Sequence, residues 1–280
     1  MKRILTIVMA MILAVSVVGL AGCKKEEEKK DGGLGNAKEG KIVVGLDDTF
    51  APMGFRDKKN KLVGFDIDLA TEVAKQMKLE VEFKPIQWKA KDLELKSKKI
   101  DCVWNGMSVT PEREKAMSLS NKYLDNKIIL MTSNNKVNIK SAKDLEKYNI
   151  GTQEDSAGLE MLKAQKNAKN FMKKVKEYPT YDDAINALKS GRVDVIAIDQ
   201  VLGAYKNKNL KEKLAICKYA LGQDAYAIGF RKEDTALRDK VNESIKAIID
   251  NGKAKEISKK WFGKNLVICK YCYFVHDPSL

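Results

Sequence analysis

Short apolar runs alternate with amphipathic helical segments along most of this 280-residue chain, and this alternation constrains the fold more than any other feature. Between Ile42 and Trp104 the order is strand, helix, strand, helix, strand, and the pattern repeats over 127–231. Strands that alternate with helices predict an α/β fold in which helices cover the sheets. Two further helices are expected at 235–251 and 253–261. A chain of this length forms one large or two modest domains.

Several local signals refine this α/β pattern. Residues 57–60 are a turn signal, so 53–55 and 62–63 are expected to form a hairpin. The run 193–198 is the most strand-like segment of the chain, and a last strand is expected at 225–231.

The N-terminus is typical of a secretory signal peptide over residues 1–22. A basic start, Met1 to Arg3, precedes an uncharged apolar run at 4–20. Small residues then lead to Cys23, which resembles the lipobox of bacterial lipoproteins. The resemblance implies cleavage before Cys23 and diacylation of its sulfur, and two acyl chains suffice for stable anchoring. The alternative is a lone N-terminal anchor helix.

The two ends of the mature chain have unusual compositions. Residues 23–40 contain one long apolar side chain, Leu34, so we expect a flexible tether that lifts a folded part beginning at Lys41. The tail 266–280 is anomalous, because it is rich in apolar and aromatic residues. It carries the cysteines and histidine of a metal-site fragment without a full tetrahedral set, so no metal is expected there. Its relevant residues are Cys269, Cys272 and His276.

Charge and histidine content exclude several classes of protein. The formal charge of +14 comes from lysines spread through every segment and mixed with acids, which indicates a solvated surface and no nucleic-acid partner. The only histidine lies in the tail, so no histidine-based triad or histidine metal site is available in the core. We therefore expect a protein without a cofactor that is not an enzyme. Cys102 and Cys217 are expected to be free thiols.

One stretch is a candidate receptor for an anion. Asn105 to Arg113 follows the apolar run 100–104 and opens a short helix. Backbone N–H groups and the helix dipole favour an anion there, and a guanidinium can grip both oxygens of a carboxylate. The alternative is a surface turn with its arginine in solvent.

Five motifs in combination resemble family 3 of the bacterial solute-binding proteins, the amino-acid-binding lipoproteins that feed ABC importers. These motifs are 64–70 (GFDIDLA), 100–113, 151–153 (GTQ), 191–194 (GRVD) with Asp199, and 261–263 (WFG). The resemblance covers about 41–265.

The resemblance implies a two-lobed, periplasmic-binding-protein-like α/β fold of type II with two crossing hinge strands, near 128–131 and 225–229. Lobe 1 would comprise 41–128 and 227–265, and lobe 2 would be 129–226, with the ligand in the cleft between them. The implied protein is a monomer, lipid-anchored on the extracytoplasmic face of the cell membrane, that captures a free L-amino acid and delivers it to an ABC permease. The alternatives are an amino-acid-sensing lipoprotein without transport and a dehydratase-like enzyme on the same scaffold.

A free amino acid is a zwitterion, so its receptor needs partners for both charges, since burying either charge alone is costly. By the family pattern, Arg113 takes the carboxylate and Asp199 the ammonium. The other implied ligand contacts are the lobe 1 loop residues Asn105, Gly106 and Ser108, the lobe 2 residues Gln153 and Ser156 at the carboxylate, the aromatic residues Phe50 and Trp88 on either side of the ligand side chain, and Asp47 at the end of that side chain. Asp47 favours a polar or basic amino acid.

Three of these assignments have structural alternatives. Asp199 could cap the following helix, Trp88 could be surface packing, and Asp47 could brace its own loop. The chain also departs from the family pattern at Asp155, where a glycine is usual, and at Ala157, where a hydroxyl is common.

Overall fold

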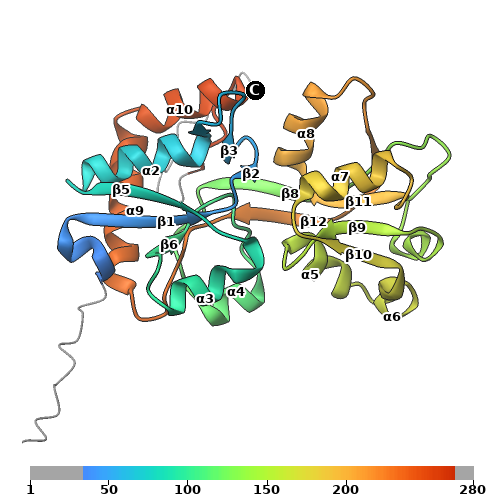
Figure 1. Cartoon of the computed structure of the whole chain (residues 1–280), viewed down its shortest axis with the longest axis horizontal. Coiled ribbons are helices and arrows are strands. Elements are labelled where there is room, and N and C mark those ends of the chain that lie inside the picture. The colour runs from blue at the N-terminus through green and yellow to red at the C-terminus, as the bar shows by residue number, and fades with distance from the viewer. Residues whose placement is uncertain (1–33, 269–280) are drawn as a thin grey trace, which may run out of the picture. The chain divides into compact units, whose positions relative to one another are not determined.

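The computed structural model describes residues 34–268, which form two α/β lobes joined by two long strands (Figure 1). Each lobe is built on a five-stranded sheet, and the strand orders are β5-β1-β6-β13-β7 in lobe 1 and β10-β9-β11-β8-β12 in lobe 2. The expected two-lobed α/β fold is confirmed.

Lobe 1 has a sheet covered on both faces. Its strands are β1 (Lys41–Leu46), β5 (Glu80–Pro85), β6 (Cys102–Val103), β7 (Ser118–Leu119) and β13 (Gly229–Phe230). Its helices are α2 (Phe65–Gln76), α3 (Lys91–Lys96), α4 (Pro111–Ala116), α9 (Thr235–Asp250) and α10 (Lys253–Phe262), with short 3₁₀ turns η2 (Gly35–Glu39) and η3 (Trp88–Ala90). Alternate residues of β1 pack on opposite faces of this sheet. Ile42 and Val44 belong to the hydrophobic cluster with α2 and α9, whereas Val43 belongs to the cluster with Trp88 and Leu95.

Lobe 2 repeats this arrangement. Its strands are β8 (Leu124–Thr132), β9 (Ile150–Gln153), β10 (Val175–Tyr178), β11 (Val195–Asp199) and β12 (Ala215–Tyr226). Its helices are α5 (Ala157–Lys163), α6 (Ala168–Phe171), α7 (Tyr181–Lys189) and α8 (Gln200–Asn209), with η4 (Ala142–Lys147) and η5 (Met172–Lys174). β11 is buried along its whole length, which explains why its sequence is a continuous apolar run.

The hairpin expected at 53–55 and 62–63 is confirmed. β3 (Gly54–Arg56) pairs antiparallel with β4 (Leu62–Val63) and with β2 (Thr49–Phe50), forming a small third sheet beside α2. This sheet holds the loop that carries Asp47 and Phe50.

The connection between the lobes differs from the sequence prediction. The strand expected at 225–231 is two strands, because β12 ends at Tyr226 and β13 begins at Gly229. β12 also begins at Ala215 and pairs antiparallel with β8, with register shifts on both sides of Ala220. These shifts interrupt the alternation of apolar and polar residues, so residues 215–224 carry no strand signal.

The ends of the described region are more ordered than the sequence suggested. The expected tether does not extend to residue 40, because Gly35–Glu39 forms a 3₁₀ turn in which Asn36 donates two hydrogen bonds, each 3.1 Å, to Asp101. At the other end, Val267 forms a β-bridge with Leu124 at the start of β8, and the Ile268 N–H donates to the Tyr123 carbonyl at 3.0 Å, so the first residues of the tail pack against the folded part. The signal peptide at 1–22, Cys23, and the tail residues Cys269, Cys272 and His276 lie outside the described residues. Within 34–268, no helix has the length and apolar character needed to cross a bilayer.

Candidate ligand-binding site

The loop between β6 and α4 is fixed by a buried carboxylate. Asp66, in the first turn of α2, accepts a hydrogen bond of 2.7 Å from the Gly106 N–H and one of 3.0 Å from the Tyr123 hydroxyl. Burial raises the pKa of Asp66 to about 7. Gly106 has φ +56°, and a Cβ atom there would lie 2.8 Å from the Phe50 ring, so the loop requires glycine. The first acid of the GFDID motif therefore positions the loop.

Arg113 is buried in the first turn of α4 and points at lobe 2. Thr110 caps the helix by accepting from the Arg113 N–H at 3.3 Å. One terminal nitrogen of the guanidinium donates to the Ser108 carbonyl and the other to the Asp155 carbonyl, both at 2.9 Å. Glu160 lies 3.6 Å from the guanidinium, and the Arg113 Nε has no hydrogen-bond partner among the described residues. The alternative of a solvent-exposed turn is wrong, since Arg113 is 4% exposed.

Asp199 is buried at the end of β11 and does not cap α8, which rules out the capping alternative. Its Oδ1 accepts from Asn126 at 2.7 Å and from the Tyr226 hydroxyl at 3.0 Å. Burial, and then the negative charge of Asp224, raise the pKa of Asp199 to about 7. Among residues 34–268, no lysine or arginine is in direct contact with Asp199, which is the environment that an ammonium group would complete.

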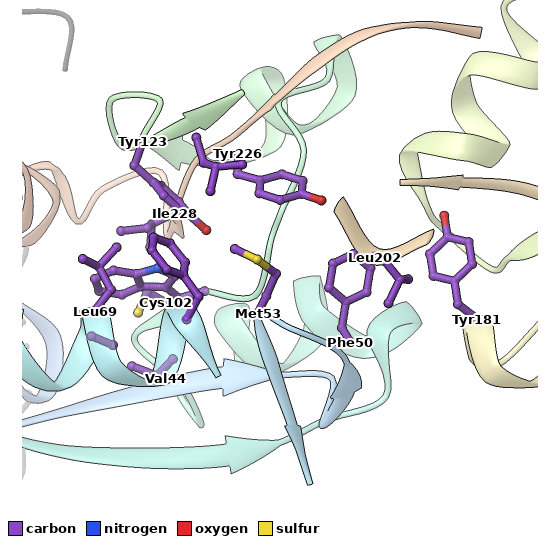
Figure 2. Packing of buried hydrophobic residues seen from close by; sticks show 14 of the residues in the cluster. Val44, Phe50, Met53, Leu69, Cys102, Tyr123, Tyr181, Leu202, Tyr226 and Ile228 are labelled. Atoms are coloured by element: carbon purple, nitrogen blue, oxygen red, sulfur yellow. The ribbon is translucent and has the colours of Figure 1, made fainter. Parts of the chain in front are cut away.

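Aromatic side chains close the site from two sides. Trp88 is 8% exposed, donates from Nε1 to the Asp155 carbonyl at 3.1 Å, and packs its ring 5.5 Å from the Arg113 guanidinium. The surface-packing alternative for Trp88 is therefore wrong. Phe50 faces Tyr181 of lobe 2 with ring centroids 6.0 Å apart, and Tyr226 points its hydroxyl toward the same side (Figure 2).

Asp47 braces its loop and also reaches the other lobe. Its Oδ1 accepts from the Thr49 N–H and hydroxyl at 2.9 and 2.7 Å, and its Oδ2 accepts from Gln153 Nε2 at 2.7 Å. The Asp47–Gln153 contact joins lobe 1 to lobe 2.

Nine of the ten residues assigned from the sequence line one cavity between the lobes. The lining residues are Phe50, Trp88, Asn105, Gly106, Ser108, Arg113, Gln153, Ser156, Ala157, Tyr181 and Asp199. Asp47 contacts Gln153 but does not line the cavity. The cavity measures about 10 Å³, which is room for about one water molecule. The structure is therefore a closed form, and a ligand larger than water can enter only after the lobes separate.

The lining offers hydrogen-bond donors that the protein leaves unused. Among the described residues, Arg113 Nε and Asn105 Nδ2 are buried without a hydrogen-bond partner, whereas the buried Tyr181 hydroxyl faces Asp199. Buried polar groups are nearly always paired, so unpaired donors around one cavity indicate a site for a ligand that carries acceptors. Tyr181 was not among the residues predicted from the sequence. It directly follows the helix-capping Thr180, and nothing distinguishes it from an ordinary first residue of α7.

An inter-lobe ion pair beside the cavity was also missed. Lys91, at the start of α3, is 2% exposed and forms an ion pair with Asp155 of lobe 2, whose side chain is 41% exposed. Asp155 has φ +54°, the left-handed conformation that the usual glycine would adopt freely. Burial and the nearby Arg113 charge lower the pKa of Lys91. The sequence placed Lys91 on a helix without indicating that its side chain is buried.

The described residues contain no cluster of three side chains able to hold a metal ion. Cys102 and Cys217 are both free.

The chain matches known proteins over nearly all of its folded part. Residues 42–264 match the model of the bacterial extracellular solute-binding proteins, family 3. The L-cystine-binding protein TcyA of Bacillus subtilis (strain 168) is 31% identical over 269 residues, covering 92% of this chain and 97% of that protein. The arginine-binding extracellular protein ArtP of the same organism is 29% identical, covering 93% of this chain and 98% of its own length.

A solved structure gives the same result. An ABC uptake transporter substrate-binding protein from Streptococcus pneumoniae with bound histidine superposes with a TM-score of 0.77 at 35% identity, covering 84% of this chain and 99% of that one.

Proposed function

Since this chain belongs to the family 3 extracellular solute-binding proteins, we propose that it captures a free L-amino acid between its lobes and delivers it to an ABC importer. The main support for this proposal is that Arg113 of lobe 1 and Asp199 of lobe 2 line one cavity. A guanidinium and a carboxylate that line the same cavity match the two charges of a zwitterion. Because they lie on different lobes, a ligand held by both favours the closed form.

The ligand carboxylate replaces a protein group at Arg113. In the closed form, the Asp155 carbonyl accepts from Arg113 at 2.9 Å. A carboxylate that takes this position gains a charge-assisted hydrogen bond, whereas a backbone carbonyl carries no net charge. Arg113 Nε and Asn105 Nδ2, which have no partner in the described structure, supply further donors.

We propose a polar or basic side chain for the ligand. We place Gln153 at the side-chain end of the site, and not at the carboxylate as the family pattern implied, because its Nε2 lies 2.7 Å from Oδ2 of Asp47. A ligand side chain with hydrogen-bond donors can replace the Gln153 amide at Asp47. Relatives named or titled for a ligand include binders of cystine, arginine, histidine and glutamine.

We also propose that the protein works as a monomer anchored through a diacylated Cys23 at the outer face of the cell membrane. The support is the sequence before Cys23 and the family's extracellular solute-binding role. Detergent phase partitioning of wild type and Cys23→Ala tests the anchor. The wild type is expected to stay in the detergent phase, and the variant is expected to move to the aqueous phase.

A thermal-shift screen of residues 33–268 against the twenty amino acids and L-cystine tests the proposed function. At 1 mM ligand and a micromolar Kd, mass action stabilises the folded state by about 4 kcal/mol. For a chain of this size that corresponds to a rise in Tm of about 10 °C. If no amino acid shifts Tm, the proposal is wrong. For delivery, loss of uptake of the bound amino acid on deleting the gene is expected.

A further inference from the structure

Three polar side chains form a row on one face of the lobe 2 sheet. β8 lies between β11 and β12, and its Asn126 is directly opposite Asp224 of β12. Ile128, two residues further along β8, is opposite Asp199 of β11. Since side chains two residues apart point to the same face, Asp199, Asn126 and Asp224 share one face of the sheet.

One amide nitrogen connects the two carboxylates. Asn126 Nδ2 donates to Asp199 Oδ1 and to Asp224 Oδ2, both at 2.7 Å. The two carboxylate oxygens are therefore no further apart than twice that distance. Asp224 Oδ2 also accepts from the hydroxyl of Ser108 at 2.7 Å, while Asp224 Oδ1 is buried without a hydrogen-bond partner among the described residues.

The surroundings of this carboxylate pair contain little compensating positive charge. Within residues 34–268, no lysine or arginine forms an ion pair with Asp199 or Asp224. Arg113 is the charged group that favours their ionised forms, and it acts from a distance. The hydroxyls of Tyr226 and Tyr181 face Asp199 from β12 and α7, and both stay neutral because burial, and then the Asp199 charge, raise their pKa values.

We propose that Asp224 is a positioning residue of the ammonium end of the site: paired with Asp199 through Asn126, it retains one shared proton in the ligand-free protein, and the ligand ammonium displaces that proton. The displacement of the proton by a ligand rests on the proposed function, whereas the shared proton does not. Asp224 acts through Asp199 and Ser108, since it does not line the cavity itself.

Two buried carboxylates this close cannot both be ionised without a cation, and they titrate as a pair. Burial raises the pKa of Asp224, and burial together with the Asp224 charge raises the pKa of Asp199 to about 7. When the ligand binds, its ammonium keeps its protons and donates hydrogen bonds to the carboxylates. The displaced proton leaves to the buffer, so both acids become ionised around one cation.

The proposal defines a chemical class of ligand. Only a group that carries a full positive charge and N–H donors replaces the proton at this pair. N-acetylated amino acids and 2-oxo acids lack that group, so they are expected to be rejected even when they retain the carboxylate.

The first experiment uses no ligand. Carboxyl carbons of ¹³C-aspartate-labelled protein are followed by NMR from pH 4 to 9 in wild type, Asp224→Asn, and Asp125→Asn as matched control. Asp125 is exposed on the adjacent position of β8, facing away from the pair. In wild type and in the control, we expect one carboxyl assigned to Asp199 or Asp224 to titrate near neutral pH. In Asp224→Asn, the titration midpoint of the remaining Asp199 carboxyl is expected to move to lower pH. If all assigned carboxyls of the pair titrate in the ordinary acid range, the inference is wrong and the proposed function stands.

The second experiment measures the proton that leaves. The amino acid identified by the thermal-shift screen is titrated calorimetrically at pH 6.5 in phosphate and in imidazole buffers, whose ionisation enthalpies differ. Wild type and Asp125→Asn are expected to release between about a half and one proton per ligand, as a shared proton with a midpoint near 7 requires. Asp224→Asn is expected to release almost none. Wild-type affinity should rise up to about tenfold from pH 6 to pH 8, whereas Asp224→Asn should show a flat profile.

A merely structural role for Asp224 would lower affinity equally at every pH and leave proton release unchanged, which would refute the proposal. If no amino acid binds, the proposed function fails, and with it the displacement step. The wild-type NMR titration shows whether the pair retains a proton near neutral pH, even if Asp224→Asn does not fold.

Discussion

The ion pair between Lys91 and Asp155 gives a quantitative prediction about closure. Lys91 is 2% exposed, and Asp155 is supplied by the opposite lobe. When the lobes separate, Asp155 moves away and water reaches Lys91. Replacing Asp155 by asparagine therefore leaves an uncompensated buried cation in the closed form only. Asparagine tolerates the left-handed φ of +54°, so the backbone, whose carbonyl bonds Trp88 and Arg113, is retained.

The size of the effect follows from the burial of the two partners. Breaking a fully buried ion pair costs about 3–5 kcal/mol. Asp155 is 41% exposed, so part of its interaction is screened by water and about 1–3 kcal/mol is expected. Because this cost falls on the ligand-binding form, the Kd of the amino acid should rise about 5- to 150-fold. The free energy of unfolding of the ligand-free protein should change by much less, since it can open.

A double-mutant cycle measured by calorimetry checks this reasoning. Lys91→Met removes the buried cation, so the double variant Lys91→Met/Asp155→Asn should return to within a few-fold of the wild-type Kd. Lys253→Met on α10, which removes a partner of the exposed Lys253–Glu256 pair, is the control and should have no effect. An unchanged Kd in Asp155→Asn, or a double variant as weak as the single one, would refute the proposed role of the pair.

Three further perturbations test the site. Arg113→Ala should weaken amino-acid binding by about 2–5 kcal/mol in calorimetry, whereas Arg192→Ala, at an exposed arginine, should not; equal affinities would remove Arg113 from the site. Gly106→Ala should lower the free energy of unfolding in urea by about 1–3 kcal/mol through its positive φ and its contact with Phe50. Gly191→Ala, with a positive φ but open space around it, should cost only about 1 kcal/mol, and equal costs would refute the steric argument. Because the pKa of Asp66 is about 7 when folded and 3.8 ordinarily, its contribution to stability is full below pH 3.8 and is lost as pH rises through 7. Urea unfolding at pH 5.5 and 8 should therefore show a decline that is smaller in Asp66→Asn, and an equal decline would contradict the buried-acid assignment.

The residues predicted best from the sequence are those fixed by a backbone element. Arg113 follows a strand and sits in the first turn of a capped helix, and Asp199 ends a continuous apolar strand. In both cases the local pattern determines where the side chain emerges. The same patterns predicted the alternation of strands and helices and the hairpin at β3 and β4.

The features that the sequence did not reveal depend on contacts between distant segments. Asp224 lies in a strand whose register is irregular, so neither its strand nor its face could be derived from alternation. Asn126 acquires its role only because β8 lies between β11 and β12. Lys91 is buried between Trp88 of its own lobe and Asp155 of the other. Burial of a charged side chain by a segment remote in sequence leaves no periodic signal.

The contact between Asp47 and Gln153 differs in kind from the two charged ends of the site. Arg113 and Asp199 are held by capped helices, strand ends and buried hydrogen-bond partners, so replacing either disturbs the surrounding structure. Asp47 and Gln153 meet only through their side-chain tips, 2.7 Å apart. Exchanging Gln153 is therefore expected to alter which side chain fits at that end while leaving Arg113 and Asp199 in place. In the proposed site, holding the two charges of an amino acid and selecting its side chain thus fall to different residues, so new specificities are expected to evolve through a few side chains without remodelling the fold.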